Sequence, residues 1–436
     1  MEYERLLSRY PYAELRIERS FQTYITIKDD EAKQSTGASA GMSARVLENG
    51  SWGFAACSDG RESAESLLEK AQRLARLTSG KIALPEPVVV KKELKADLEP
   101  ADPESQVKAL LDAGKVMKED RVASRSVSCT DSLVKKEFYN SGGSRIVQET
   151  GYSYLSCSCV ARSGGAIQRG SERTWSRTGF SRIDAGATAA KARDKAIRLL
   201  SASPPPKGRF TVVFDPEMTG VLSHEAVGHA CEADSVIDRE SILAGKLGKR
   251  IGNDLVTIID DPSAPDFGQY NFDDEGTEAR PTTLLEKGVL KGYLNSLETS
   301  AELGIGRNGH ARAQDYSEAP IVRMSNTYFQ KGASTVDEVF GIPSGVYLRG
   351  MKGGSVDIFS GGFMFKAEEA YEIANGEKGK LMRDVTITGN ILQTLLDVEC
   401  VGDDFGTSPG ICGKFSQEAP VSDGGPHIRV KNVAIG

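Results

Sequence analysis

Two histidines and a glutamate stand close together in the stretch from Val221 to Asp234, which reads VLSHEAVGHACEAD. Glu225 directly follows His224, and His229 comes five residues after His224. Two imidazoles with a carboxylate beside the first are the ingredients of the H-E-x-x-H zinc peptidase motif, in which the histidines bind the metal and the glutamate acts as base. The stretch therefore predicts a metal centre with hydrolytic chemistry.

The spacing of these histidines is one residue longer than in that motif. In a regular helix, a residue five positions on lies about 140° round the axis, so both rings could not reach one ion. A π-type turn, closed by an i to i+5 hydrogen bond, brings the second ring back over the first, and Gly228 tolerates such a distortion. We therefore predict an irregular helix.

A purely structural role is the alternative for the same residues. Glu225 and His229 can form a pair on a helix surface, and His224 can be a hydrogen-bonded core histidine. The surrounding residues, however, are apolar enough to bury the helix: Val221, Leu222, Ala226, Val227 and Ala230. Because two histidines and a glutamate are costly to bury without a partner, the metal interpretation is favoured.

A catalytic zinc site has three protein ligands and one open position, so a third ligand is needed. Cys412 stands out, because GICGKF places it between glycines, which predicts a turn with an accessible sulfur. Lys414 nearby would favour the thiolate. Cys400, in LLDVEC, is expected in a buried helix. Spacing alone leaves the choice open among Glu232, Asp234, His310, Cys400, Cys412 and His427.

Two other motifs give weaker signals. Gly304 to Gly309 matches G-x-G-x-x-G, but the flanking strand and helix that dinucleotide binding requires are not predicted, so we expect a flexible loop. The acidic run Asp273, Asp274 and Glu275 lacks EF-hand spacing and is expected to be a solvated loop.

Loops of the same region carry cations and amides that suit peptide recognition. Guanidinium and amide groups bind carboxylates and peptide backbone well, and glycine-rich strands such as RGMKGGSVDIFSGGF allow an extended peptide to come close. The candidates in these loops are Arg307, His310, Arg312, Arg323 and Asn326. Of these, Arg323, Asn326 and Arg307 are the predicted substrate-binding residues.

The rest of the chain must position these groups. Alternating strands with a hairpin signal at Asn49-Gly50, followed by helical spacing from 61 to 78, predict a small α/β unit. A helix at 105–117, strands from 121 to 179 and a helix at 185–200 repeat that order, which suggests a diverged repeat. A proline-containing connector spans 84–103, and three prolines at 204–206 mark the clearest boundary.

The predicted domains follow from these boundaries. Residues 1–95 form an N-terminal α/β domain with connector, 96–206 a middle domain of helices and hairpins, and 207–436 the catalytic domain. The last is expected to hold mixed, mostly antiparallel strands that carry the irregular histidine helix. The fold class is therefore multi-domain α+β.

Composition and charge indicate which classes of binding partner and which location to expect. The 436 residues include 54 Lys+Arg and 61 Asp+Glu, without a basic block interleaved with aromatics, so no nucleic-acid partner is expected. No apolar run approaches a membrane span and no signal segment is found at the start, so a cytoplasmic protein is expected. Seven scattered cysteines fit reduced thiols, and Cys157 and Cys159 are expected on one buried strand face.

Several blocks in this order resemble the TldD branch of the TldD/PmbA (TldE) family of zinc metallopeptidases. They are HEAVGHACEAD, DDEGT from Asp273, RMSNTY from Arg323, GGSVDIFSGGFMF, and PGICGKFSQ with GGPHIRV. The resemblance runs from the early hairpins to the end and is sharpest from 208 to 436. The PmbA branch is similar in fold but has no histidine motif, so this chain resembles the active partner. Ser416 departs from the family's glycine in GKxGQ.

The resemblance implies one zinc ion per chain, held by His224, His229 and Cys412, with Glu225 as general base. It also implies hydrolysis of unstructured peptides or small unfolded proteins, by a dimer formed with an identical chain or with a TldE/PmbA-like homologue. Glu232 and Asp234 are expected to hydrogen-bond the zinc-binding rings.

Two rival functions belong to other classes. A non-catalytic scaffold or peptide-binding subunit would bind peptide without stoichiometric zinc. A cysteine hydrolase that uses Cys412 with a histidine would survive chelators and be killed by alkylating agents.

Overall fold

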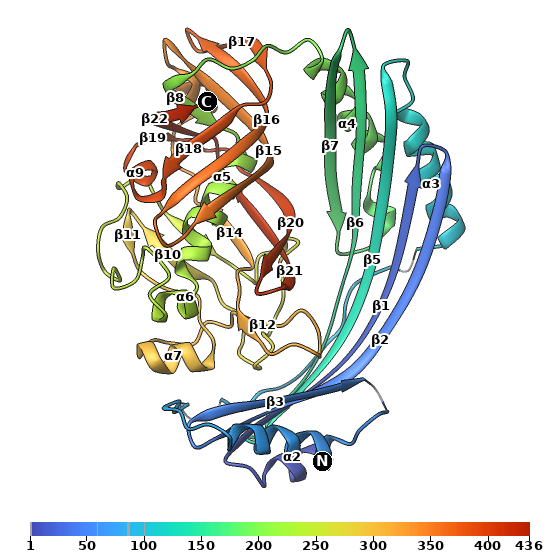
Figure 1. Cartoon of the computed structure of the whole chain (residues 1–436), viewed down its shortest axis with the longest axis vertical. Helices are drawn as coiled ribbons and strands as arrows, with labels where there is room; N and C mark the ends of the chain where they lie inside the picture. The colour runs from blue at the N-terminus through green and yellow to red at the C-terminus, as the bar shows by residue number, and fades with distance from the viewer. Residues whose placement is uncertain (1, 59, 85–87, 100) are drawn as a thin grey trace.

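A computed structural model describes residues 2–58, 60–84, 88–99 and 101–436. The N-terminal half forms one large twisted sheet with helices, and the C-terminal half forms a body of shorter strands and helices beside it (Figure 1). This is the predicted multi-domain α+β fold. Pro85, Pro87 and Pro100 of the predicted connector lie outside the described residues. No helix in the described part of the chain is long and apolar enough to cross a membrane.

The large sheet has the order β3-β2-β1-β5-β6, with β7 and β4 also paired to β6. Strands β1 and β5 are antiparallel and pair from Glu14 with Asn140 to Lys28 with Ser126. Predicted regions 1–95 and 96–206 therefore share one sheet, and the boundary at 95 stays a prediction. The strands are β1 (Tyr12–Lys28), β2 (Glu31–Glu48), β3 (Ser51–Ser58), β4 (Lys91–Leu94), β5 (Val122–Asn140), β6 (Arg145–Ser163) and β7 (Ala166–Ser176).

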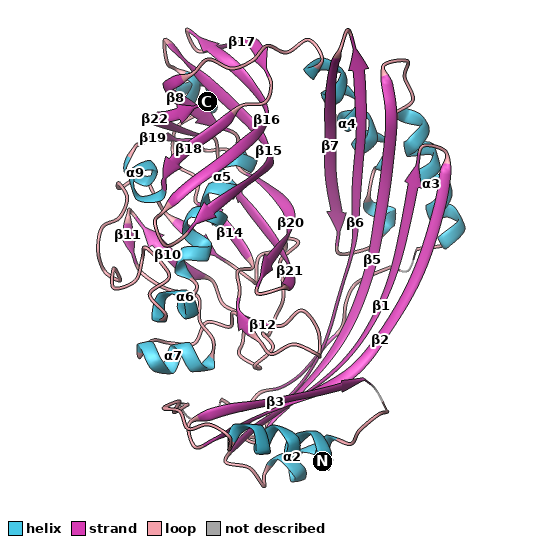
Figure 2. Cartoon of the chain, in the orientation of Figure 1, coloured by secondary structure: helices cyan, strands magenta, loops and turns pink. Residues whose placement is uncertain are grey.

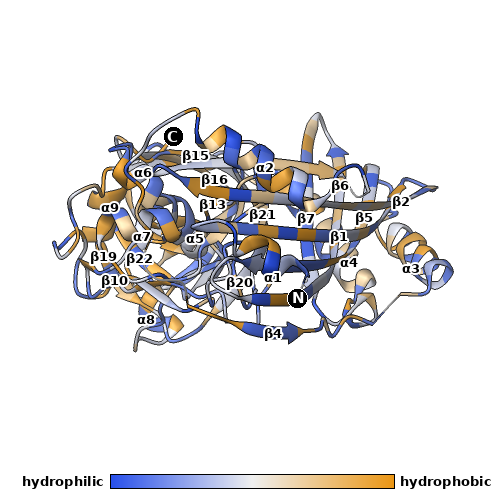
Figure 3. Ribbon diagram, turned by 90° about the horizontal axis from the view of Figure 1, so that it is seen from below, coloured by the Kyte–Doolittle hydropathy of each residue, from blue (hydrophilic) through white to orange (hydrophobic). Residues whose placement is uncertain are grey.

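Alternating residues give this sheet two different faces, which Figure 3 shows as alternating hydrophilic and hydrophobic bands along β1 and β5. In β6, Leu155, Cys157 and Cys159 point to one face and are buried, which confirms the expected role of the two cysteines as core residues. Helices α3 (Pro103–Val116) and α4 (Ala185–Leu199) cover that face, on the side away from the C-terminal body (Figure 2). The more polar face is turned towards that body.

The sheet is built from two copies of one pattern, three antiparallel strands followed by a helix. In the first copy, helix α2 (Ala64–Ala75) packs so closely on β3 that a Cβ at Gly53 would lie 1.8 Å from the carbonyl oxygen of Ala71. In the second, a Cβ at Gly170 of β7 would lie 2.0 Å from the carbonyl oxygen of Ala192 in α4. The same glycine contact in both copies supports the diverged repeat.

Gly53→Ala is expected to lower the free energy of unfolding by about 3 kcal/mol, because the added methyl group meets helix backbone that cannot move without separating α2 from the sheet. Denaturant unfolding of both proteins measures the change. Gly37→Ala is the matched control, since Gly37 lies in exposed β2 and a Cβ there has nothing within 4 Å. Equal losses in the two variants would contradict the close helix contact.

The C-terminal body contains two further sheets. In the first, β15, β8, β22, β18 and β16 pair in that order and β15 also pairs with β16, which closes a ring of strands. In the second, the order is β11-β10-β9-β14-β21-β20. The ring consists of β8 (Gly208–Phe214), β15 (Ser344–Asp357), β16 (Gly362–Ala374), β18 (Thr386–Asn390) and β22 (Ile428–Ile435), with β17 (Glu377–Met382) and β19 (Val398–Val401) attached.

The second sheet contacts the histidine stretch. Its members are β9 (Ile258–Asp260), β10 (Thr282–Glu286), β11 (Val289–Leu290), β14 (Asn326–Phe329), β20 (Gly406–Lys414) and β21 (Gln417–Gly425). A small separate pair is formed by β12 (Ala311–Arg312) and β13 (Ile321–Val322). Short helices complete the body: α6 (Ala233–Ile237), α7 (Leu297–Leu303), α8 (Val336–Phe340) and α9 (Ile391–Leu396).

Two local expectations need correction. The helix expected through Cys400 ends at Leu396, and Cys400 lies in strand β19, where it is buried as expected. The β-branched valines of DVECV favour the strand. The segment from Gly304 to Gly309 follows α7, which Gly304 ends with a φ of 65°. It is a loop as expected, but it is fixed by two hydrogen bonds between Asn308 and Asn295 rather than free.

The acidic run is buried, contrary to the expected solvated loop. Asp273, Asp274 and Glu275 are at most 7% exposed. Lys136 of β5 donates to Asp274 at 2.8 Å, and Arg45 of β2 donates to Glu275 at 2.7 Å. The counter-charges are distant in sequence, so the run alone could not reveal them. The ion pairs of Asp274 and Glu275 therefore link the C-terminal body to the large sheet.

Candidate metal centre

The histidine stretch is helical but irregular. Helix α5 (Pro216–Val221) begins after Asp215, whose carboxylate accepts a hydrogen bond from the Met218 N–H. It continues as a π-helix (Leu222–Gly228), in which the N–H of His229 donates to the carbonyl of His224. This is the i to i+5 bond that the spacing predicts. The irregular helix is confirmed.

The π-turn brings the two imidazoles together. Their ring centroids are 5.1 Å apart and the rings are nearly perpendicular, at 89°. Gly228 has a packing role here as well, because a Cβ on it would lie 2.0 Å from the sulfur of Met324. The histidine helix is held in the largest apolar core of the protein, where Leu222, Ala226 and Val227 are fully buried.

Cys412 of β20 completes a cluster with the two histidines. Its Sγ lies 3.4 Å from Nε2 of His229. Ligand atoms of His224, His229 and Cys412 all lie within 4.8 Å of one another, and no other such group of three His, Cys, Asp or Glu side chains is found in the described ranges. Two nitrogen donors and one sulfur donor are a set that zinc accepts.

The surroundings of Cys412 differ from the expected accessible turn. Cys412 lies in a strand and is 7% exposed, and the turn comes later, at Phe415 and Ser416. Ser416 has a φ of 64°, a conformation that favours the glycine of the family pattern. Lys414 points to carboxylates and not to the sulfur. Burial raises the pKa of Cys412, but hydrogen bonds and charge from His224 and His229 outweigh it and lower the pKa to about 5.

Glu232 fixes the orientation of His229. Its carboxylate accepts a hydrogen bond from Nδ1 at 3.0 Å, so Nε2 is the ring nitrogen that faces Cys412. Burial raises the pKa of Glu232, but the charges of His229, Lys414 and Arg323 lower it to about 2, so it is ionised. Lys414 joins Glu232, at 3.1 Å, to Asp234, at 2.7 Å. Asp234 therefore acts on the ring only through Lys414 and Glu232.

Glu225 lies on the open side of the cluster. Its Oε2 is 4.0 Å from Nε2 of His229, the nitrogen that faces Cys412, and its side chain is 34% exposed. A carboxylate beside the metal-binding atoms and accessible to water is placed where a general base is needed.

His224 has a buried neighbour that sequence reasoning missed. The Nδ1 of His224 and the Oδ1 of Asp423 are both buried without a hydrogen-bond partner. Burial raises the pKa of Asp423 to about 7, although the charge of His224 opposes the shift. Asp423 lies in β21, and no motif around it signals a link to the histidine helix. An unsatisfied ring nitrogen in a buried His–His–Cys cluster fits the binding of a cation.

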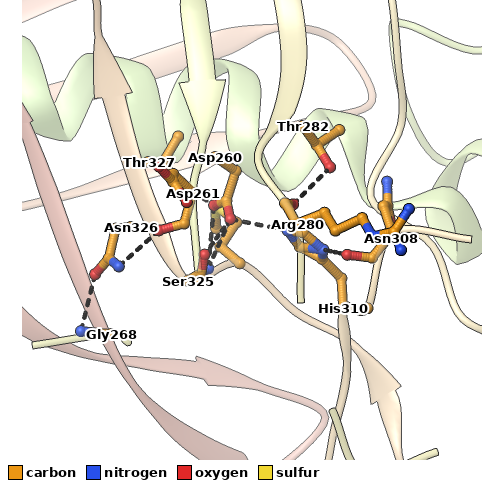
Figure 4. A network of polar contacts seen from close by, with 12 residues as sticks. Asp260, Asp261, Gly268, Arg280, Thr282, Asn308, His310, Ser325, Asn326 and Thr327 are labelled. Atoms are coloured by element: carbon orange, nitrogen blue, oxygen red, sulfur yellow. Dashed lines mark hydrogen bonds and ion pairs between the residues drawn. The ribbon is translucent and has the colours of Figure 1, made fainter. Parts of the chain in front are cut away.

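The side chains of the three predicted substrate-binding residues are not part of the metal cluster. Arg323 is 1% exposed and donates to the carbonyls of Cys412 and Gln417, so it supports β20 and β21. Asn326 accepts from the Gly268 N–H and donates to the Asp261 carbonyl (Figure 4). Arg307 lines a separate cavity beside β4. None of the three joins the metal cluster, and their contact with substrate stays a prediction.

The remaining candidates for a third ligand are engaged elsewhere. His310 is buried and its Nε2 lies 2.9 Å from Asp260, which also accepts from the hydroxyl of Thr327 (Figure 4). His427 lies 2.7 Å from Asp404, and Cys400 lies in a different apolar cluster. Of the six candidates, only Cys412 places a ligand atom within 4.8 Å of those of both histidines in the described part of the chain, whereas Glu232 binds His229 through Nδ1.

Three family models together match most of the chain. They are the PmbA/TldA metallopeptidase domain 1 at residues 13–76, the central domain at 96–200 and the C-terminal domain at 207–436. A metalloprotease of Methanothermobacter thermautotrophicus is 41% identical, over 98% of this chain and 96% of its own. A zinc metalloprotease TldD homolog of Saccharolobus solfataricus is 32% identical, over 98% and 96%.

Solved structures share the fold along the whole chain. TldE from Thermococcus kodakarensis matches with a TM-score of 0.81 at 23% identity and covers 100% of both chains. A putative modulator of a DNA gyrase from Thermotoga maritima matches with a TM-score of 0.82 at 22% identity, over 100% of this chain and 99% of that one. With the three domains matched in order and relatives similar over nearly their full length, the chain belongs to the PmbA/TldD family of metallopeptidases.

Proposed function

We propose that the protein is a zinc-dependent peptidase that hydrolyses unstructured peptides or small unfolded proteins, with one zinc ion per chain. The observation that carries this proposal is the cluster of His224, His229 and Cys412, whose ligand atoms lie within 4.8 Å of one another. Relatives described as metalloprotease and zinc metalloprotease support it.

Each residue of the metal centre has a separate role in the proposed hydrolysis. When bound, a zinc ion would lower the pKa of a water molecule and polarise a peptide carbonyl. Cys412 as thiolate and the Nε2 lone pair of His229 would hold the ion with His224, and Glu232 keeps the proton of His229 on Nδ1. Glu225 accepts a proton from the attacking water and then delivers it to the leaving amine.

The proposed working form is a dimer, with an identical chain or with a TldE/PmbA-like homologue. The fold shared with TldE of Thermococcus kodakarensis supports an assembly of that kind. Co-purification of the native complex, followed by mass spectrometry, would identify the partner and any bound peptide.

Removal of metal is expected to abolish peptide cleavage, and stoichiometric zinc is expected to restore it. Metal content by mass spectrometry and cleavage of an unfolded protein such as reduced casein provide the measurements. A scaffold subunit would bind peptide with no stoichiometric zinc. Cleavage that survives chelation but is lost on alkylation would instead show a cysteine hydrolase.

A further inference from the structure

A cavity of about 350 Å³ lies between the polar face of the large sheet and the C-terminal body. This is within the size range of ligand-binding pockets. Its sheet wall includes Ser132, Thr150 and Tyr152, and its opposite wall includes Ile411 and Ala419. Ile411 precedes Cys412 in β20, and Ala419 of β21 pairs with Cys412 in register. The cavity thus reaches the strand that carries the proposed sulfur ligand.

Two arginines in this cavity have no ion-pair partner among the described residues. Arg177, directly after β7, donates only to the carbonyl of Phe267, at 3.4 Å. Arg312, in β12, donates to the carbonyl of Met324 at 2.7 Å and lies over the ring of Tyr270, 4.8 Å from its centroid. The carboxylates of Asp273, Asp274 and Glu418 also line the cavity. Asp274 is paired with Lys136, and Asp273 accepts hydrogen bonds from backbone N–H groups.

The environment of these two arginines disfavours their charged forms. Burial lowers the pKa of Arg177, and the charge of Arg312 lowers it further. Burial also lowers the pKa of Arg312, although the charges of Asp274 and Asp260 oppose the shift. A carboxylate that binds in the cavity beside these guanidinium groups would stabilise their charged forms, and Arg is well suited to such pairing.

We propose that Arg177 and Arg312 form a subsite for a carboxylate of the peptide substrate, either its C-terminus or an acidic side chain. The proposal rests on the proposed peptidase function for the identity of the ligand. The aromatic rings of Tyr152, Phe267 and Tyr270 form part of the cavity surface and would contact the neighbouring peptide residue. The subsite would place the substrate along β20, beside the metal centre.

Binding to the Glu225→Gln variant tests the subsite separately from cleavage. The probes are three fluorescein-labelled hexapeptides of Gly, Ala and Ser: one with a free C-terminus, one amidated, and one amidated with Glu as its last residue. At least one carboxylate-bearing peptide is expected to bind about tenfold or more tightly than the neutral amide, as judged by anisotropy. Comparison of the free-acid and Glu peptides identifies the source of the carboxylate.

Arg177→Gln, added to the same protein, is expected to remove this preference and leave the affinity for the neutral amide nearly unchanged. Arg169→Gln is the matched control, because Arg169 is an exposed arginine of β7 outside this cavity, and it should keep the preference. Unchanged zinc content and circular dichroism exclude misfolding. Equal affinity for all three peptides, or a preference that survives Arg177→Gln, would overturn the proposal, whether or not the wild-type protein cleaves peptides.

Discussion

Glu225→Gln is expected to lower kcat for peptide cleavage about 10³-fold while zinc remains bound. The amide cannot accept the proton of the attacking water, and general acid–base catalysis by one side chain contributes about 10²- to 10⁴-fold. Glu225 is not part of the cluster of ligand atoms, so the variant should keep its metal. Steady-state kinetics on zinc-loaded protein, with zinc measured in the same sample, gives both quantities.

Glu240→Gln serves as the control for this loss. Glu240 is an exposed glutamate a short distance along the same segment, and its substitution should leave kcat unchanged. Retention of the wild-type kcat by the Glu225→Gln protein would show that Glu225 is not the general base. Loss of zinc together with activity would instead assign it a role in metal binding.

Cys412→Ser is expected to weaken zinc binding by about 100-fold or more and to abolish cleavage at limiting zinc. A serine hydroxyl stays protonated at neutral pH, whereas the pKa of Cys412 is lowered to about 5 by the two histidines despite its burial. Loss of a group that merely orients a ligand already costs about 10- to 100-fold in metal affinity, so loss of the thiolate should cost at least as much. Competition with a chromogenic chelator measures the affinity.

Cys400→Ser is the comparison, since Cys400 is also a buried strand cysteine but lies in a separate apolar cluster. It should keep full zinc affinity even if stability falls. Full zinc occupancy in Cys412→Ser would show that the third ligand is another group. Activity lost with zinc affinity intact would favour the cysteine hydrolase.

The sequence predicts the local geometry of the histidine helix well. His224 and His229 are one residue further apart than in H-E-x-x-H, and a single π-type turn accommodates that residue. The choice of Cys412 came from the family resemblance, since spacing left six candidates open. Its environment was predicted incorrectly: glycines on both sides suggested a turn, but Cys412 pairs with Ala419 within a regular hairpin. Glycine is compatible with a strand when neighbouring backbones approach closely.

Sequence patterns do not predict contacts between segments that are far apart in the chain. The burial of Asp274 and Glu275 depends on Lys136 and Arg45, which belong to a different half of the molecule. Asp423 was missed for the same reason, because only the pairing of β21 places it near the histidine helix. Charge runs and short motifs describe neighbours in the chain, whereas these interactions are set by tertiary packing.

The closed ring of strands has a consequence for translation. Its first strand, β8, immediately precedes the histidine helix, and its last, β22, follows Cys412 in the chain. Cys412 is made 183 residues after His229, so for part of translation the emerging chain holds both imidazoles without the sulfur and without the closed ring of strands. On the proposed mechanism, a nascent chain in which Cys412 has not yet been made has no hydrolytic activity, so it cannot cleave other unfinished polypeptides near it.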